Sequence, residues 1–399
     1  MLDLGRELEG DLIELCRELI RTPSVNGRDS EKDVAEIVAR FAIEHDLTAE
    51  LLAADAARPN AIVHCGPAAE HVGLLLVAHT DTVPIGDPTA WNWPPFGAEL
   101  VGERIYGRGA IDNKGGLVAA LGAMSMVRRL GPRSCANPPM LIAVPDEESG
   151  ATGTLGVHYL KKAGRLAGRG AIYTYPGMDF IEIGHRGVLR LSLRAKGKAF
   201  HSGSRDWQEA SVGHNALTGL AEILLRLERL RFSDLAASDL FADFRTVVTP
   251  TTISGGSGPS IVPPECTATV DIRLVPQVPR TTVEQEVRQV IAEVTGQRPG
   301  LSAEMRTEIF IPNTEIPRDA DIIRALQSAA ETTLGREPGL AVSGPANESH
   351  ILNGYGIPTC VFGPVGENAH AADEYVETRS IFQAAQIYAS TALQLGGGS

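Results

Sequence analysis

The sequence predicts an α/β protein with a mixed central sheet and a smaller domain inserted into the larger one. Two short, wholly apolar runs, 73–78 and 140–145, are typical of strands buried on both faces, as in parallel or mixed sheets. A helix is predicted between them over 115–130, so strand, helix and strand follow one another as in a βαβ unit. The length of 399 residues suits two domains better than one.

The N-terminal segment is predicted to be helical. Leu12, Leu15, Leu19 and Ile20 repeat at helical spacing, and a second helix is expected over 30–45. Charged residues run through the first helix, which excludes a signal peptide or a membrane span there. No other apolar run approaches the ~20 residues needed to cross a bilayer.

From about residue 187 the sequence alternates apolar and polar residues, which is typical of a strand with one solvent-exposed face. The elements expected from there on are a strand over 189–196, a helix over 216–230, strands over 247–254 and 266–274, a helix over 283–294, a strand over 302–310 and two closing helices over 319–334 and 379–395. The order β-α-β-β-α-β predicts an inserted ferredoxin-like domain. We expect a catalytic domain at 1–187 and 307–395, an inserted lid or dimerisation domain at 188–306, and a flexible tail at 396–399.

Composition argues against several classes of partner. The formal net charge of -13 would repel nucleic acid and anionic membrane surfaces. The 5 cysteines are scattered, odd in number and without a C-x-x-C pair, which indicates reduced thiols in a cytoplasmic protein. We therefore expect a cytoplasmic enzyme with a small-molecule substrate.

Polar residues gather just beyond the two predicted buried strands, where ligands usually bind in open α/β sheets. His79 and Asp81 follow the first strand, and such a carboxylate can hold one ring N–H while the other ring nitrogen binds a metal. Asp146, Glu147 and Glu148 follow the second strand and repel one another unless a cation or proton offsets their charge. Because side chains alternate along an extended chain, Glu147 and Glu148 can serve different roles. Alone, these segments also fit a surface histidine and a solvated acidic turn.

Two further segments add candidate ligands. Asp112 stands among glycines in 107–116, which is also compatible with a glycine-rich turn but lacks the spacing of a nucleotide-binding loop. His370 is followed by Asp373 and Glu374. Two histidines and several carboxylates on separate loops match the ligands of zinc or manganese hydrolases.

Five motifs, in this order, resemble the family of acetylornithine deacetylase, succinyl-diaminopimelate desuccinylase, aminoacylase and carboxypeptidase G. They are HTDTVP (79–84), GRGAIDNKGG (107–116), PDEESGATGT (145–154), KAFHSGS (198–204) and NAHAADEYV (368–376). The likeness extends over essentially the whole chain. It implies a homodimeric, metal-dependent hydrolase that cleaves an amide-like C–N bond of a small carboxylate-bearing molecule, with zinc or manganese as cofactor.

The resemblance also implies a ligand set. His79 would bind a first metal with Asp81 orienting its ring, and Asp112 would bridge that metal to a second one. Glu148 and His370 would complete the second site.

The remaining roles implied by the resemblance concern catalysis and substrate. The peptide bond between Asp112 and Asn113 would be cis, and Glu147 would be the general base. On the inserted domain, His201 would stabilise the oxyanion across a dimer interface. Arg273 would hold the substrate carboxylate with its guanidinium.

Tyr175 departs from the family pattern, because it stands where the family carries an acidic ligand of the first metal. A phenol, with a pKa near 10, binds zinc poorly unless it is ionised. The first site would then retain only His79 and Asp112, and Asp179 or Glu182 is an alternative ligand. One or two metal ions per chain both fit this sequence.

Two more departures lie at expected substrate contacts. Ser260 replaces an asparagine, and Asn347 lies in a segment that replaces Gly-Thr-Asp; with Tyr175 they are the candidate substrate-binding residues beside Arg273. These changes favour an unusual substrate. A single-metal aminohydrolase or deaminase acting on an unusual amine, aromatic ones included, is the alternative function, and a non-catalytic binding relative is a third.

Overall fold

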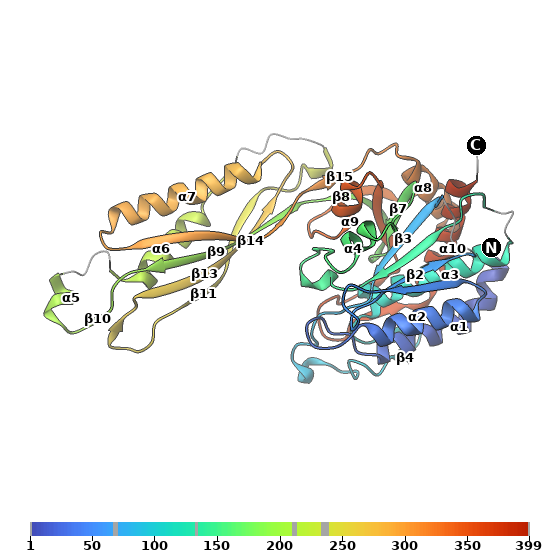
Figure 1. The fold of residues 1–399 in the computed structure, drawn as a ribbon, viewed down its shortest axis with the longest axis horizontal. Helices are drawn as coiled ribbons and strands as arrows, with labels where there is room; N and C mark the ends of the chain where they lie inside the picture. The colour runs from blue at the N-terminus through green and yellow to red at the C-terminus, as the bar shows by residue number, and fades with distance from the viewer. Residues whose placement is uncertain (1, 67–70, 132–134, 210–213, 233–238, 398–399) are drawn as a thin grey trace. The chain divides into compact units, whose positions relative to one another are not determined.

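A computed structural model describes residues 2–66, 71–131, 135–209, 214–232 and 239–397, which form two compact units (Figure 1). The first unit comprises Met1–Gly184, Glu315–Ala341 and Asn347–Ser399, and the second comprises His185–Thr314 and Val342–Ala346. The expected boundary at 306 falls inside strand β14 (Ser302–Ile311), which the second unit keeps whole. The main segment of the second unit, His185–Thr314, therefore ends later than the sequence suggested.

The first unit is built around a mixed sheet, nine-stranded over the described residues, in the order β1-β2-β6-β3-β7-β17-β8-β15 with β16 beside β8. Its strands are β1 (Thr48–Leu52), β2 (Asn60–His64), β3 (Leu74–His79), β6 (Met140–Val144), β7 (Gly170–Tyr173), β8 (Gly177–His185), β15 (Thr314–Glu315), β16 (Gly339–Ser343) and β17 (Thr359–Gly363). β3 pairs in parallel with both β6 and β7. Every residue of β3 and β6 is buried, which confirms the two predicted buried strands.

Helices cover this sheet. They are α1 (Leu2–Arg21), α2 (Lys32–Glu44), α3 (Gly115–Arg129), α4 (Val157–Lys162), α8 (Asp321–Leu334), α9 (Ser349–Gly354) and α10 (Thr378–Gly396). α3 packs against both α1 and α10, and a Cβ at Gly122 would lie 2.8 Å from a Leu12 methyl and 3.1 Å from the Ala385 Cβ. Glycine at this position therefore allows the three helices to approach closely.

The expected flexible tail begins too early at 396. Gly396 is the last residue of α10 and is buried, and its carbonyl accepts a hydrogen bond of 2.9 Å from the Asn137 amide. The tail expectation for 398–399 lies outside the described residues.

A small sheet in the first unit joins two motif segments. Its order is β18-β19-β5-β4, with β4 (Glu99–Val101), β5 (Arg104–Tyr106), β18 (Gly366–Glu367) and β19 (Tyr375–Glu377). The β18–β19 hairpin encloses His370, while β5 leads directly into the segment of Asp112. Because β19 pairs with β5, the two ligand-bearing segments leave the same sheet side by side.

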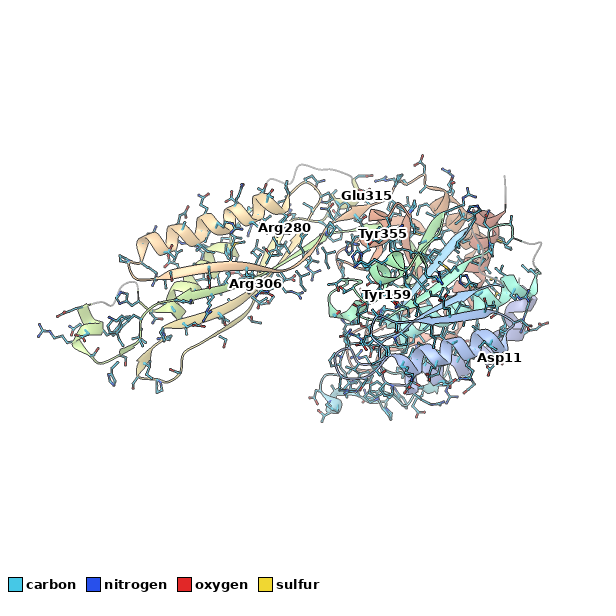
Figure 2. The ribbon with its side chains drawn as sticks, viewed as in Figure 1. Asp11, Tyr159, Arg280, Arg306, Glu315 and Tyr355 are labelled. Atoms are coloured by element: carbon cyan, nitrogen blue, oxygen red, sulfur yellow. The ribbon has the colours of Figure 1, made fainter. Side chains whose placement is uncertain are left out.

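The second unit contains an antiparallel sheet in the order β11-β13-β9-β14 with two helices packed on it (Figure 1). In chain order its elements are β9 (Gly187–Lys196), α6 (Ala216–Leu227), β11 (Val247–Gly255), β13 (Glu265–Leu274), α7 (Arg280–Gln297) and β14. This is the predicted β-α-β-β-α-β order. Leu189, Leu191 and Leu193 point into the core under the helices. Arg280 lies at the start of α7 (Figure 2), and its guanidinium carbon is 4.7 Å from the centroid of the Phe310 ring on β14.

Short elements complete the two units. In the second unit, β10 (Phe200–His201) pairs with β12 (Ile261–Val262), near α5 (Arg205–Glu209). The single-turn elements are η1 (Pro88–Ala90), η2 (Ala110–Lys114), η3 (Glu147–Ser149) and η4 (Asp239–Phe241). In the part of the chain that the structure describes, no helix combines the length and apolar character that a membrane span requires.

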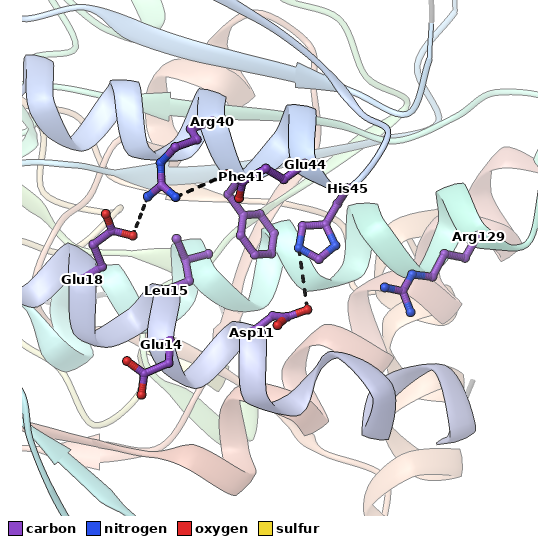
Figure 3. Close-up of a pocket in the computed structure, with 9 residues that line it drawn as sticks. All are labelled: Asp11, Glu14, Leu15, Glu18, Arg40, Phe41, Glu44, His45 and Arg129. Atoms are coloured by element: carbon purple, nitrogen blue, oxygen red, sulfur yellow. Dashed lines mark hydrogen bonds and ion pairs between the residues drawn. The ribbon is translucent and has the colours of Figure 1, made fainter.

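A surface pocket lies beside α1 and α2 (Figure 3). Its lining residues are Asp11, Glu14, Leu15, Glu18, Arg40, Phe41, Glu44, His45 and Arg129. Arg40 pairs with Glu18 and Glu44, and His45 lies 3.9 Å from the Asp11 carboxylate. None of the lining residues belongs to a motif of the sequence, so we assign this pocket no function.

Candidate metal centre and active site

The candidate site lies at the carboxyl ends of the parallel strands β3 and β6. His79 is the last residue of β3 and is fully buried. Glu147 and Glu148 form the start of η3, which two residues, Pro145 and Asp146, separate from the end of β6. Because neighbouring parallel strands open on the same edge of a sheet, these side chains meet there. Asp112, in η2, reaches the same edge.

Four of the predicted ligands converge at this edge. His79 Nε2 lies 2.9 Å from Asp112 Oδ1, and His370 Nε2 lies 3.1 Å from both Asp112 Oδ2 and Glu148 Oε1. The candidate ligand atoms of His79, Asp112 and Glu148 all lie within 4.8 Å of one another. Two atoms that each coordinate one ion at ~2 Å are at most about 4 Å apart, so small side-chain adjustments suffice to enclose a cation.

The charges of these groups balance one another. Hydrogen bonds that the imidazole donates to Asp112 and Glu148 raise the pKa of His370 to about 10. Although burial alone would raise it, hydrogen bonds with His370 and His79 hold the pKa of Asp112 well below its usual range. Positive charge is thus strongly favoured between the carboxylates, and a divalent cation supplies it. Imidazole and carboxylate ligands suit zinc and manganese, and the residues present therefore fit the metal that the resemblance implies.

Asp81 has a wider role than the sequence indicated. His79 Nδ1 lies 2.9 Å from the backbone carbonyl oxygen of Asp81 and 3.5 Å from its Oδ1, so both oxygens of this residue face the ring. The same carboxylate accepts hydrogen bonds from the backbone amides of Glu147 at 3.2 Å and Glu148 at 3.0 Å, and from the Asn26 side chain at 2.5 Å. Asp81 therefore orients the first ligand mainly through its backbone carbonyl, while its buried carboxylate fixes the backbone of the acidic turn.

Glu147 is buried beside the ligands, with 6% of its surface exposed. Burial raises the pKa of Glu147 to about 8, with Glu148 and Asp112 contributing in the same direction and His79 opposing them. A carboxyl group whose pKa lies near neutrality can accept a proton and return it at the pH of the cell.

The peptide bond between Asp112 and Asn113 is cis, as the resemblance implies. The side-chain amide of Asn113 joins β3 to the end of β7. Its Oδ1 accepts hydrogen bonds from the backbone N–H of His79 at 3.3 Å and from Thr174 Oγ1 at 3.1 Å. Its Nδ2 donates to the Thr174 carbonyl at 2.8 Å. A Cβ at Gly116 would lie 2.1 Å from that carbonyl. The polar and glycine residues around Asp112 thus fix the loop against two strands, a function that the sequence did not reveal.

Tyr175 follows β7 and lines the site. Its ring stacks on Tyr173 at 4.8 Å and lies 5.3 Å from the His79 ring. Burial, with the carboxylates of Glu147 and Asp112, raises the pKa of Tyr175 well above its ordinary value. The phenol therefore stays protonated at neutral pH, and a protonated phenol is a poor metal ligand.

Among the described residues, the two alternative acids named from the sequence do not join the ligand cluster. Asp179 pairs with Arg336 on the surface. In the described parts of the chain, the cluster of metal-ligating side chains contains neither Asp179 nor Glu182. Neither Asp179 nor Glu182 thus compensates for the phenol of Tyr175.

Glu348 is a buried acid that the sequence analysis missed. Its side chain is fully buried, and Oε2 accepts a hydrogen bond of 3.2 Å from the Tyr173 hydroxyl. Burial raises the pKa of Glu348 well above its ordinary value. Its neighbour Asn347 accepts a hydrogen bond of 2.9 Å from the Ser349 amide at the start of α9, so this side chain has a local structural partner, and its contact with substrate stays a prediction.

His201 and Ser260 lie together in the second unit. His201 belongs to β10, and the Ser260 carbonyl accepts a hydrogen bond of 2.9 Å from the Ser202 amide. His201 Nδ1 accepts a hydrogen bond of 3.1 Å from the Gly203 amide. Because Nδ1 accepts, Nε2 is the ring nitrogen that carries a proton for donation.

Arg273 lies in the four-stranded sheet of the second unit, near the end of β13, whereas His201 belongs to the separate β10–β12 pair. Arg273 pairs with Asp271 at 2.8 Å and sits one residue from the end of β13, whereas Ser260 precedes the start of that strand. Eight residues of extended chain separate Glu265 from Arg273, and at ~3.3 Å per residue this is about 26 Å. Within one copy of the unit, Arg273 is thus far from both His201 and Ser260.

Comparison with known proteins identifies relatives over the whole chain. The model of peptidase family M20/M25/M40 matches residues 75–394. The succinyl-diaminopimelate desuccinylase of Methylocella silvestris is 27% identical over 395 residues, covering 96% of this chain and 97% of the relative. Two solved structures share the fold. The M20 family metallo-carboxypeptidase Sso-CP2 of Sulfolobus solfataricus has a TM-score of 0.75 at 19% identity, covering 96% of this chain and 99% of that one. The YXEP protein of Bacillus subtilis, a dinuclear metal binding peptidase, has a TM-score of 0.70 at 18% identity, covering 97% and 98%.

Proposed function

This chain belongs to peptidase family M20/M25/M40, and we propose that it hydrolyses the amide bond of a small N-acyl compound bearing a carboxylate. It is a metal-dependent hydrolase acting on C–N bonds; the proposal concerns the substrate and the residues that perform the reaction. The observation that carries it is the convergence of His79, Asp112, Glu148 and His370 around one small volume, with Glu147 beside them.

The substrate class is supported by a relative and by charge. The relative from M. silvestris is named for removing a succinyl group from succinyl-diaminopimelate. Arg273 offers a guanidinium fork of the kind that binds carboxylates. Tyr175 and Ser260 depart from the family pattern at the site, so we propose an N-acyl substrate other than the common ones.

The chain's own residues divide the work. Asp112, Glu148 and His370 would hold a divalent cation, zinc or manganese, with His79 beside them. When bound, such an ion polarises the scissile carbonyl and lowers the pKa of water.

Glu147 takes the proton of the attacking water as the new C–O bond forms, and returns it to the nitrogen as the C–N bond breaks. Proton transfer of this kind contributes about 10²–10⁴ in rate. The Nε2–H of His201 donates to the carbonyl oxygen as negative charge develops there.

We propose one tightly held metal ion per chain. The protonated phenol of Tyr175 replaces the carboxylate of the first site, which leaves only His79 and the shared Asp112. Tyr175 also favours a second candidate function, the hydrolytic removal of an amino group from an unusual amine by one metal ion. The two reactions differ in product, because only the second releases ammonia.

We propose a homodimer as the active form. Arg273 lies about 26 Å along β13 from Glu265, and His201 and Ser260 belong to segments beyond the Glu265 end of that strand; this span exceeds a small substrate. If both sets contact one substrate, a second copy of the chain must supply one of them. The 5 cysteines are free and four of them are buried, which supports a cytoplasmic location.

A substrate screen tests the proposed function. The purified protein is freed of metal and incubated with N-acyl amino acids, dipeptides and aromatic amines, each with zinc or manganese, and the release of carboxylic acid and ammonia is measured separately. We expect metal-dependent release of an acid from an N-acyl compound. Ammonia as the sole product would favour the aminohydrolase, and no product from any class would favour a binding protein.

A further inference from the structure

The turn that carries His370 has an unusual backbone. Asn368, His370 and Asp373 all have positive φ angles, of 64°, 63° and 56°, a conformation that residues other than glycine adopt at some cost. The His370 side chain is 53% exposed, so packing holds it only weakly. Contacts elsewhere in the turn must therefore fix where the imidazole lies.

Asp373 anchors this turn to the segment after η1. Its Oδ1 accepts hydrogen bonds from the Asn92 amide at 2.8 Å and the Trp93 amide at 3.3 Å, and its Oδ2 accepts from Asn92 Nδ2 at 2.7 Å. The turn is also closed on itself, because Asn368 Nδ2 donates to the Asp373 carbonyl at 3.2 Å. Three residues after His370, one carboxylate thus ties the turn to the rest of the unit.

Glu374 anchors the other ligand loop. Its Oε1 accepts from the backbone amides of Ile111 at 3.0 Å and Asp112 at 3.1 Å, and its Oε2 accepts from the Gly109 amide at 3.0 Å. The Arg108 guanidinium pairs with the same carboxylate, and both side chains are 1% exposed. The backbone of Asp112 is therefore held directly by the residue that follows Asp373.

We propose that Asp373 and Glu374 are positioning residues of the metal centre, which together set the distance between His370 and Asp112. The two carboxylates contact different segments, so that of Asp373 fixes the turn of His370 and that of Glu374 fixes the loop of Asp112. The inference rests on the proposed function, in which His370 and Asp112 bind the metal. Groups that orient metal ligands typically contribute 10–100-fold to metal affinity.

Asp373→Ala tests the proposal. Asp373 is half-buried and Asn92 is exposed, so their contacts add little to global stability, and the metal-free variant should unfold at the wild-type temperature. We expect its dissociation constant for zinc, measured by calorimetry, to rise 10–100-fold. The visible absorption spectrum of the cobalt-substituted variant should also differ from that of wild type, because the His370 ligand is displaced.

Matched variants distinguish the positioning of His370 from a general loss of stability. Asp87→Ala removes a carboxylate from the segment that leads to Asn92. This carboxylate accepts from the Thr89 amide at 2.9 Å and from Thr89 Oγ1 at 2.8 Å. The Asp87→Ala variant should bind zinc as wild type does. Asp373→Asn keeps an oxygen for the two backbone amides and should be intermediate. Combining it with Asn92→Asp reverses the side-chain hydrogen bond and should restore affinity.

Zinc affinities of the Asp373, Asn92 and His370 variants decide between the positioning role, the ligand assignment and neither. Wild-type zinc affinity in Asp373→Ala, while His370→Ala has lost it, would overturn the positioning role alone. If the unfolding temperature of metal-free Asp373→Ala falls enough to account for its weaker binding, Asn92→Ala, which removes a single hydrogen bond, replaces it as the test. Asn92→Ala should weaken zinc binding at an unchanged unfolding temperature, and wild-type affinity there would overturn the positioning role. Wild-type affinity in His370→Ala would overturn the ligand assignment and the inference with it.

Discussion

Glu147→Gln should stabilise the metal-free protein at alkaline pH while removing its general base. The carboxyl group is buried, so ionisation costs more in the folded protein than in the unfolded one, where water hydrates the charge. Burial raises the pKa of Glu147 from its ordinary 4.5 to about 8. A glutamine of the same shape carries no charge at any pH and avoids this cost.

The direction and size of this change in the free energy of unfolding follow from the linkage between protonation and folding. Because the folded state binds the proton more tightly, the free energy of unfolding falls as pH rises from about 4.5 toward about 8, and then levels off. A tenfold difference in proton affinity between the folded and unfolded states corresponds to ~1.4 kcal/mol. Glu147→Gln should therefore raise the free energy of unfolding by on the order of 4 kcal/mol at pH 8.5, and by only about 1 kcal/mol at pH 5.

Urea unfolding of chelator-treated protein at the two pH values measures this difference. Glu36→Gln is the control, because Glu36 is exposed on α2 and solvent hydrates its carboxylate in both states. Equal effects of Glu147→Gln at pH 5 and pH 8.5, or a loss of stability at pH 8.5, would refute the reasoning that Glu147 is a buried acid held near neutrality.

Two further substitutions test the site. Tyr175→Asp should restore the acidic ligand of the first metal and raise the metal content from one to two ions per chain by elemental analysis; a count that stays at one would show that the phenol is not what limits it. Glu374→Gln should lower the free energy of unfolding of the metal-free protein by about 3–5 kcal/mol, since it leaves the buried Arg108 without its counter-charge. Urea unfolding measures this loss, and a value below ~1 kcal/mol would contradict the buried pairing.

Most of the fold could be predicted from sequence because its large elements have clear periodicity. The apolar run 140–145 became β6, and the helix expected over 283–294 lies within α7. The short strands β7 and β17 were not predicted, because four or five apolar residues fit a buried strand and a helix segment equally well. The strands of the small sheet, two or three residues long, carry no periodicity at all.

The candidate ligands could be named from sequence, but the groups that hold them could not. His79 and Asp112 stand out through motifs, since chemistry restricts the residue types at those positions. Nothing in the sequence indicates that Glu348 lies beside Tyr173, 175 positions away, or that Asp81 accepts from the amide of Glu148. Such contacts depend on how distant segments pack, which local sequence does not specify.

Turnover of Glu147→Gln, with metal content measured on the same sample, tests the central claim most directly. The proposed mechanism has a metal held among His79, Asp112, Glu148 and His370, and Glu147 as the base. If it is right, the variant should keep the wild-type metal content and show at most about a hundredth of wild-type turnover. A fully metal-loaded variant that retains about a third of wild-type turnover would contradict it, since general-base catalysis is worth at least ~10²-fold.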